Sequence, residues 1–297
     1  MSNSYRIAGI GEVLWDVFPE GEEFGGAPAN FSCHASGLGA EVCMVSSVGA
    51  DERGARALAF LGRQGVDVEH VARVDGRPTG VVQVSLSAAG KPTYEIVQPV
   101  AWDQIPWTDG MAGVAGKLDA VCFGTLGQRS PVSRETIQRF VAATRPECLR
   151  VFDINIRQDF YSRDLILASL ELANVLKLND EELPLLAGML DIPGAPEEQL
   201  AGLVERCGLR LAVLTCGGEG ALMMTPSERD FAVPTQVEVV SSVGAGDSFT
   251  AAMIMGYLRG KPLPAINQAA NALAAYVCTQ RGAVPTLPEV VRARVMG

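Results

Sequence analysis

The chain has 297 residues, of which 48% are hydrophobic and 20% are charged, so it can bury a full-sized core and is neither a disordered chain nor a small disulfide scaffold. The 34 acidic and 24 basic side chains give a net charge of -10. Because the Lys and Arg residues form no cluster, such a surface would repel a phosphate backbone, and we expect no nucleic acid partner.

Short segments rich in Val and Ile alternate along the chain with segments that carry apolar residues at helical spacing. The predicted strands are Arg6 to Gly11, Val42 to Val48, Asp119 to Gly124, Arg150 to Ile154, Val175 to Leu178, and Leu211 to Thr215. The predicted helices are Ala27 to Leu38, Glu52 to Gln64, Ser133 to Ala143, Pro196 to Cys207, and Ser248 to Arg259. This alternation predicts a single α/β domain over residues 1–297, with a mainly parallel sheet covered on both faces.

Two segments interrupt the alternation, Trp15 to Phe24 and Gly80 to Val100. In the second, Val82 and Val84 alternate with polar residues, which is typical of a strand with one solvated face. Both segments are too polar for the central sheet. We therefore predict that about residues 13–25 and 80–100 form a small antiparallel sheet, which projects from the main body as a lid.

Cysteines and histidines indicate a reduced protein without a metal centre. The seven cysteines are scattered and never spaced as C-x-x-C, and His34 and His70 have no second ligand at metal spacing. The apolar run before Glu12 is too short for a secretion signal. The longest uncharged stretch, Pro262 to Gln280, carries amides that a bilayer would leave unpaired, so we expect a buried helix there. These features predict a cytoplasmic protein with no membrane partner.

The segment that carries chemistry is Val243-Gly244-Ala245-Gly246-Asp247-Ser248-Phe249, which leads into an apolar helix. Small residues before a helix let backbone N–H groups converge where the helix dipole favours negative charge. Phosphoryl transfer needs such an anion hole, because the charge on the transferred group must be stabilised without covalent help. Asp247 beside it is placed to accept a proton from an attacking hydroxyl. On this segment alone, capping of the helix is an equally good interpretation of Asp247.

With a second motif, this segment closely resembles the signatures of the ribokinase (PfkB) family of carbohydrate kinases, over about Arg6 to Pro285. The second motif, Gly25-Gly26-Ala27-Pro28-Ala29-Asn30, is similar to the family's glycine pair and sugar-binding Asn. The resemblance implies a ribokinase-like three-layer α/β/α fold and transfer of the γ-phosphate of ATP to a sugar hydroxyl. It also implies that Asp247 is the general base and that the amides of Gly244, Ala245 and Gly246 hold the developing charge.

By the same resemblance, the sugar is bound by Asp16, Gly25, Gly26 and Asn30. A carboxylate and an amide can together bind adjacent hydroxyls, and glycines allow close backbone approach. Considered without the resemblance, Asp16 fits a turn, Asn30 an ordinary helix position and the glycines a tight bend.

Lys177 to Glu182 follows a predicted strand and resembles the family's N-x-x-E motif, which organises water around magnesium, through Asn179 and Glu182. Three-residue spacing on a helix puts two side chains on one face. Magnesium keeps most of its waters and meets one or two carboxylates, so we expect Glu182 to meet Mg²⁺ through water. The alternative is a capped helix with acidic residues in its first turn.

Thr215 to Gly220 resembles the family's T-x-G-x-x-G loop, so Thr215, Gly217 and Gly220 are expected at the ATP phosphates, although a plain hairpin would use the same glycines. Asn271 matches a position that lines the adenine pocket. Many relatives hold a monovalent cation with an Asp where this chain has Ser241. A hydroxyl is a weaker ligand than a carboxylate, which weakens the expectation of potassium activation.

Within the family, further segments resemble bacterial fructokinases, among them Ala101-Trp102-Asp103 and Asp153-Ile154-Asn155-Ile156-Arg157. Arg157 would donate to a sugar oxygen or to the moving phosphoryl group, and a surface ion pair is its alternative. We expect fructose as the substrate and 2-keto-3-deoxygluconate as the second choice, because a sugar acid requires a cation, either Arg157 or Arg129. A sugar-binding sensor without turnover is the alternative of another class. Relatives often dimerise through the lid, so we expect a homodimer.

Overall fold

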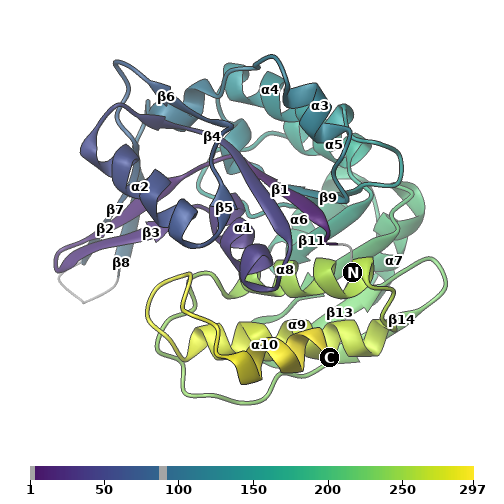
Figure 1. Cartoon of the computed structure of the whole chain (residues 1–297). Coiled ribbons are helices and arrows are strands. Elements are labelled where there is room, and N and C mark those ends of the chain that lie inside the picture. The colour runs from purple at the N-terminus through teal and green to yellow at the C-terminus, as the bar shows by residue number, and fades with distance from the viewer. Residues whose placement is uncertain (1–3, 87–91) are drawn as a thin grey trace.

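The protein is described here by a computed structural model, which covers residues 4–86 and 92–297. Its centre is a ten-stranded sheet in the order β14-β13-β12-β11-β10-β9-β1-β4-β5, with β6 paired to β4 (Figure 1). The strands are β1 (Arg6–Ile10), β4 (Glu41–Gly49), β5 (Val66–Asp67), β6 (Val71–Val74), β9 (Ala120–Phe123), β10 (Leu149–Asp153), β11 (Val175–Asn179), β12 (Leu211–Thr215), β13 (Ala221–Met224) and β14 (Arg229–Ala232). Neighbours from β5 to β12 pair in parallel, and β13 and β14 add an antiparallel edge. The predicted strands are all present, with boundaries that differ by one residue at most.

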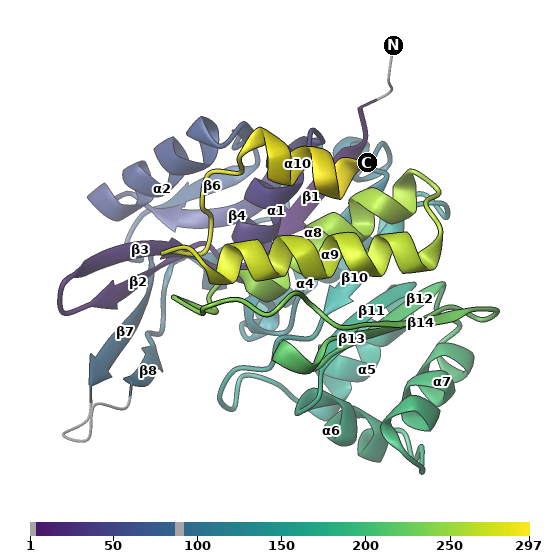
Figure 2. The ribbon, with the colours of Figure 1, turned by 90° about the horizontal axis from the view of Figure 1, so that it is seen from below.

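Side chains of the central strands alternate between two hydrophobic cores, as expected for a sheet covered on both faces. Ile7 and Val151 belong to one core, whereas Val45 and Phe152 belong to the other. The first core is closed by α1 (Ala27–Gly37), α2 (Glu52–Arg63), α8 (Ala245–Leu258), α9 (Leu263–Cys278) and α10 (Glu289–Met296). The second is closed by α3 (Met111–Ala115), α4 (Pro131–Ala142), α5 (Arg163–Leu172), α6 (Glu182–Met189) and α7 (Pro196–Arg206). The three-layer α/β/α fold is confirmed (Figure 2).

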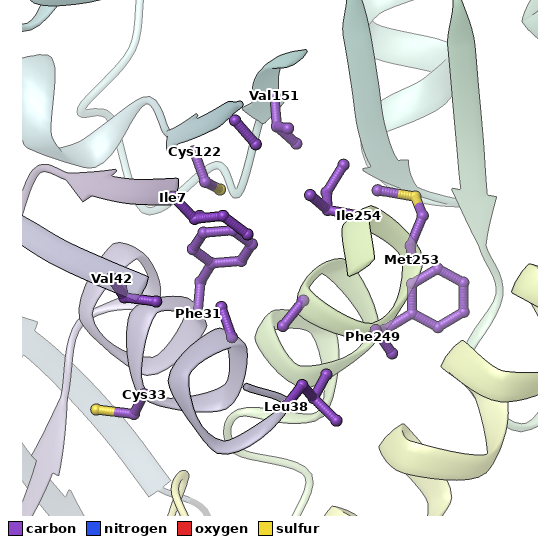
Figure 3. Close-up of a cluster of buried hydrophobic side chains, with 14 of the residues drawn as sticks. Ile7, Phe31, Cys33, Leu38, Val42, Cys122, Val151, Phe249, Met253 and Ile254 are labelled. Atoms are coloured by element: carbon purple, nitrogen blue, oxygen red, sulfur yellow. The ribbon is translucent and has the colours of Figure 1, made fainter. Parts of the chain in front are cut away.

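Helices α1 and α8 pack side by side against the middle of the sheet. Figure 3 shows Phe31 of α1 and Ile254 of α8 directed toward Ile7 and Cys122 of the strands. Because these residues are almost fully buried, the two helices are held rigidly against each other. This packing fixes the relative positions of their N-termini, which matters for the site described below.

A separate four-stranded sheet, here called the small sheet, consists of β2 (Leu14–Phe18), β3 (Gly21–Gly25), β7 (Gly80–Leu86) and β8 (Pro92–Ile96), in the order β3-β2-β7-β8. The predicted small sheet is thus present, and it projects from the main body in both views (Figures 1 and 2). Its outer pairs are antiparallel, and the central pair, β2 with β7, is parallel. Leu14, Val82 and Ile96 pack against Trp102 and Leu126, which attaches the small sheet to the body.

The stretch 262–280 forms α9, whose inner face is buried, and no helix in the two described ranges is long and apolar enough to cross a membrane. His34 is buried, with Nε2 2.9 Å from the carbonyl oxygen of Ala283, so it is a packing residue as expected. The seven cysteines are free thiols.

Candidate active site

A cavity of about 1140 Å³ lies where the small sheet, the N-termini of α1 and α8, and the loops after β11 and β12 meet. It brings together residues from segments far apart in the chain. The predicted site residues on its wall are Asp16, Gly26, Asn30, Arg157, Asn179, Glu182, Thr215, Gly217, Gly220, Gly244, Ala245, Gly246, Asp247 and Asn271. Gly25 is the exception, since it is buried beneath the wall, where a Cβ would come 2.7 Å from Asp16 Oδ2.

The start of α8 forms one side of the cavity. Gly244 is the N-cap residue, with φ 79°, and a Cβ there would lie 2.3 Å from the carbonyl oxygen of Ala283. Only glycine fits both the left-handed backbone and this close approach. The first N–H groups of a helix lack intrahelical acceptors and carry the positive end of its dipole. The helix start on the cavity wall can therefore hold an anion such as a phosphate.

Asp247 lies in the first turn of α8, at the third helical position. The helix begins three residues before the predicted Ser248, so the alternative in which Asp247 is the capping residue is wrong. Its Oδ2 accepts a hydrogen bond of 2.9 Å from Asn30 Nδ2 of α1. Burial, and secondly the charge of Asp153, raise the pKa of Asp247 to about 6. A carboxyl with this pKa is a better proton acceptor at neutral pH than an exposed one.

The side of the cavity next to the small sheet carries Asp16 and Asn30. Asp16 is in the middle of β2 rather than in a turn, and burial together with the charge of Glu23 raises its pKa to about 6. Asn30 lies inside α1, as the alternative interpretation of an ordinary helix position predicts. Its amide nitrogen nevertheless donates to Asp247, and its Oδ1 is buried without a partner among the described residues. Both side chains thus have oxygen atoms available for hydroxyl groups.

Glu12 is a residue whose role the sequence did not reveal. It lies two residues after the end of β1, is 2% exposed and lines the cavity. Its Oε1 accepts the N–H of Ala27 at the start of α1 (3.2 Å), while Oε2 has no partner in the described part of the chain. Burial raises the pKa of Glu12 to about 7. The signal available in the sequence is a lone carboxyl immediately after an apolar strand.

Lys177 was likewise not singled out, although it interrupts the apolar strand Val-Leu-Lys-Leu. It is 8% exposed, lines the cavity, and its Nζ lies 2.9 Å from Asp153 Oδ1. Burial disfavours the charged Lys177, but the neighbouring Asp153 carboxylate outweighs it and the pKa is raised. Nζ is also only 3.1 Å from the position that a Cβ on Gly246 would take, next to the anion hole.

Asn179 and Glu182 do not share a helix face, contrary to the prediction, because Asn179 ends β11 and α6 begins only at Glu182. Instead they bond reciprocally: Asn179 Oδ1 accepts the Glu182 N–H (2.8 Å), and Glu182 Oε2 accepts the Asn179 N–H (2.9 Å). Glu182 Oε1 accepts the N–H of Ile156 (2.8 Å). The helix alternative, with an acidic residue in its first turn, thus describes the local structure.

These contacts allow a test of the fit to magnesium. Within residues 4–86 and 92–297, no cluster of three His, Cys, Asp or Glu side chains could enclose a metal ion. Each carboxylate oxygen of Glu182 accepts one N–H and keeps a lone pair for a water molecule. The residues present therefore fit a Mg²⁺ ion held mainly by phosphates and water.

The loop from Thr215 to Gly220 is the turn of the β12–β13 hairpin, so the hairpin alternative is correct for its local structure, and its residues also line the cavity. Gly217 and Gly220 have φ values of 52° and 119°. Asn271 on α9 is held by Asn267, whose Oδ1 accepts from Asn271 Nδ2 at 2.9 Å.

The two candidate cations for a sugar carboxylate differ in the structure. Arg157 is exposed and lines the cavity. Arg129 makes two hydrogen bonds with Asp103, of 2.8 and 2.9 Å, and its guanidinium group lies 3.8 Å from the centre of the Trp102 ring. Arg129, with its side chain 4% exposed and paired with Asp103, is not among the residues that line the cavity, so it is not placed to meet a substrate carboxylate.

A helix start able to hold a phosphate, with a buried carboxyl beside it, is the arrangement that phosphoryl transfer to an alcohol group requires. Residues 10–290 match the pfkB family carbohydrate kinase pattern, and the chain belongs to that family. It is similar to a sugar kinase of Pyrococcus horikoshii, with 30% identity in an alignment 298 positions long that covers 94% of this chain and 92% of the relative. A crystal structure of that relative in complex with ATP has a TM-score of 0.80 at 25% identity, covering 97% of this chain and 99% of the other.

A second relative is the fructokinase of Salmonella typhimurium, 29% identical in an alignment 300 positions long that covers 94% of this chain and 95% of the relative. The protein is thus a sugar kinase that uses ATP. The family, the fold and the class of reaction expected from the sequence are confirmed.

Proposed function

We propose that the protein transfers the γ-phosphate of ATP to a primary hydroxyl of a ketose, and that fructose is its substrate. The observation that carries the proposal is the position of Asp247, a buried carboxyl at the helix start on the cavity wall. Three carboxyls, Glu12, Asp16 and Asp247, surround the sugar end of the cavity, which favours a neutral polyol over an anion. The fructokinase relative supports the same substrate.

In the mechanism we propose, Asp16 and the unpaired Oδ1 of Asn30 accept hydrogen bonds from sugar hydroxyls. Because Asn30 Nδ2 donates to Asp247 Oδ2, the Oδ1 of Asp247 remains for the proton of the attacking hydroxyl. As the sugar oxygen bonds to the γ-phosphorus, the bond to the β–γ bridging oxygen breaks and ADP leaves. The N–H groups of Gly244, Ala245, Gly246 and Asp247 stabilise the charge on the transferred group.

The nucleotide would lie on the other half of the cavity. Thr215, Gly217 and Gly220 would contact its phosphates, and Asn271 its adenine. When bound, Mg²⁺ neutralises phosphate charge, and Glu182 with Asn179 would hold its water molecules. Ser241 Oγ accepts the N–H of Val243 (3.3 Å), and we propose no monovalent cation there.

A second candidate substrate is 2-keto-3-deoxygluconate, because Arg157 lines the cavity and could face a carboxylate. Assay of ADP release with a panel of ketoses and sugar acids decides between the two. We expect turnover with fructose to exceed that with the sugar acid. The reverse order would replace fructose, and sugar binding without ADP release from any sugar would favour a sensor over an enzyme.

The base is tested by Asp247→Asn, which keeps the shape of the side chain and removes the proton acceptor. We expect turnover to fall by about 10²- to 10⁴-fold while sugar and ATP still bind. Asp109→Asn, on the exposed surface, is the matched control and should retain turnover. Unchanged turnover in Asp247→Asn would remove Asp247 from this role.

We also propose that residues 1–297 act as one kinase domain in the cytoplasm, where the free thiols would stay reduced. The small sheet would close over the bound sugar and exclude water, since an open site hydrolyses ATP. The partner we propose for the small sheet is a second copy of the chain, which would make the protein a homodimer.

A further inference from the structure

Behind the anion hole lies a buried ion pair that the proposed mechanism does not use. Asp153 ends β10 and stands opposite Lys177 in the parallel register with β11. Lys177 Nζ is 2.9 Å from Asp153 Oδ1, and the two side chains are 10% and 7% exposed. Burying two charges is costly even when they are paired. Such a pair at the wall of an active-site cavity therefore suggests a role in the chemistry.

The pair is connected to the start of α8 through Thr250. The Thr250 hydroxyl oxygen is 3.0 Å from Asp153 Oδ2 and 3.0 Å from the carbonyl oxygen of Gly246. Lys177 Nζ lies 3.1 Å from the Cβ position of Gly246. The ion pair thus lies against the first turn of α8, at the residues whose N–H groups form the anion hole.

The pair also stands among the charges that act on Asp247. The Asp153 charge raises the pKa of Asp247, while Lys177, Arg157 and the Asn30 hydrogen bond lower it. Lys177 is influenced by Glu182 and Asp247 as well as by Asp153, so it keeps two carboxylates as neighbours when Asp153 is replaced. The other titratable groups that face Asp247 are Glu12 and the buried thiol of Cys122.

We propose that the Asp153–Lys177 ion pair is a positioning element for phosphoryl transfer. Through Thr250 it fixes the first turn of α8, and its two charges act in opposite directions on Asp247, where this carboxyl accepts a proton at neutral pH. The inference rests on the proposed role of Asp247 as the base. Neither residue of the pair takes part in bond making or breaking.

The proposed effect of the pair's charges on Asp247 is tested with Asp153→Asn and with the double variant Asp153→Asn/Lys177→Met. The single variant leaves an uncompensated positive charge, so the acidic limb of the pH profile of kcat/KM should move down by about one unit. The double variant removes both charges, and its limb should return toward the wild-type position. If the acidic limb of the pH profile stays in place in the single variant, or is equally displaced in both variants, the proposed effect of the pair's charges on Asp247 is wrong. Loss of a merely structural contact would lower the rate without such a pattern.

The same shift can be read without any substrate. In protein labelled with ¹³C-aspartate, the Asp247→Asn variant identifies the carboxyl signal of Asp247. The titration midpoint of this signal should move down in Asp153→Asn and return toward the wild-type value in the double variant. If no sugar is phosphorylated, the proposed function fails, but this titration still decides the inference. A midpoint that is the same in wild type and Asp153→Asn overturns it.

The proposed positioning of the first turn of α8 through Thr250 is tested with Thr250→Val, which removes the hydroxyl and changes no charge. We expect kcat to fall about tenfold, with the acidic limb in place and KM for the sugar within about twofold, as expected when one charge-assisted hydrogen bond that orients the site is lost. Thr250→Ser should restore kcat. Wild-type kcat in Thr250→Val, or no recovery in Thr250→Ser, contradicts the role of this connection. This variant also keeps the test informative if Asp153→Asn does not fold.

Discussion

At the scale of single residues, the cavity concentrates carboxyls that hold their protons unusually tightly. Glu12 has a pKa of about 7, and Asp16 and Asp247 have pKa values of about 6, in each case chiefly because of burial. The sequence identified Asp16 and Asp247 by resemblance, but it assigned no role to Glu12. Its burial arises from contacts with distant segments, such as the N–H of Ala27, and a motif does not reveal those contacts.

Glu12 therefore leads to a prediction about stability. Its folded pKa of about 7 lies above the reference value of 4.5, so the folded state binds a proton that the unfolded state releases between these values. The resulting stabilisation is complete below about pH 4.5 and is lost as the pH rises through about 7. Glu12→Gln carries no charge at any pH, so relative to wild type it should gain about 3 kcal/mol between pH 4.5 and pH 8. Urea unfolding at several pH values measures this difference.

The matched control for Glu12 is Glu69→Gln, at an exposed position. It should follow the wild-type dependence of unfolding free energy on pH. If Glu12→Gln also follows it, the buried carboxyl does not titrate as described.

At the scale of elements, the sequence identified the strands of the central sheet well, because strands buried on both faces are continuous apolar runs. It missed β5, β6 and β14, which are short and lie at the margins of the sheet, where pairing depends on neighbours more than on composition. The parallel pairing of β2 with β7 was also missed, since the two strands are far apart in the chain. The start of α8 was placed three residues late, because Gly244 to Gly246 do not form an apolar pattern.

The start of α8 yields the prediction at this scale. Gly244→Ala puts a Cβ on a residue with φ 79°, 2.3 Å from the carbonyl oxygen of Ala283. The strained backbone should cost about 1–3 kcal/mol of unfolding free energy, and displacement of the helix start should raise KM for ATP. Denaturant unfolding and steady-state kinetics measure the two effects. The control is Gly113→Ala, a helical position with open space around it, where alanine should be neutral or stabilising by up to about 1 kcal/mol. Equal stability of the two variants would refute the requirement for glycine at Gly244.

At the scale of the whole molecule, the site exists because the sheet topology brings together segments that are distant in the chain. Asp153 ends β10 and stands opposite Lys177, two residues before the end of β11, close to the carboxyl edge of the sheet where α/β proteins commonly place their ligands. Asn30 and Asp247 meet because α1 and α8 pack against the same face of the sheet. The sequence motifs indicated which residues form the site, but only this packing explains why they converge. The Asp153–Lys177 pair could not be predicted, because its two members become neighbours only through the pairing of β10 with β11.

The small sheet leads to the last prediction, which concerns the assembly. Its edge strands β3 and β8 each pair with one neighbour only among the described residues, and an edge with free N–H and C=O groups can pair with another chain. Tyr94 on β8 is 50% exposed, an apolar contact available to a second copy. We expect a solution mass of two chains by light scattering, and a mass of one chain for Tyr94→Asp. Val290→Asp, at a 75% exposed position on α10, should remain dimeric, because α10 is not part of the small sheet. A wild-type protein that is monomeric at every concentration would exclude the homodimer and leave the kinase mechanism unaffected, since every residue assigned to that mechanism belongs to one chain.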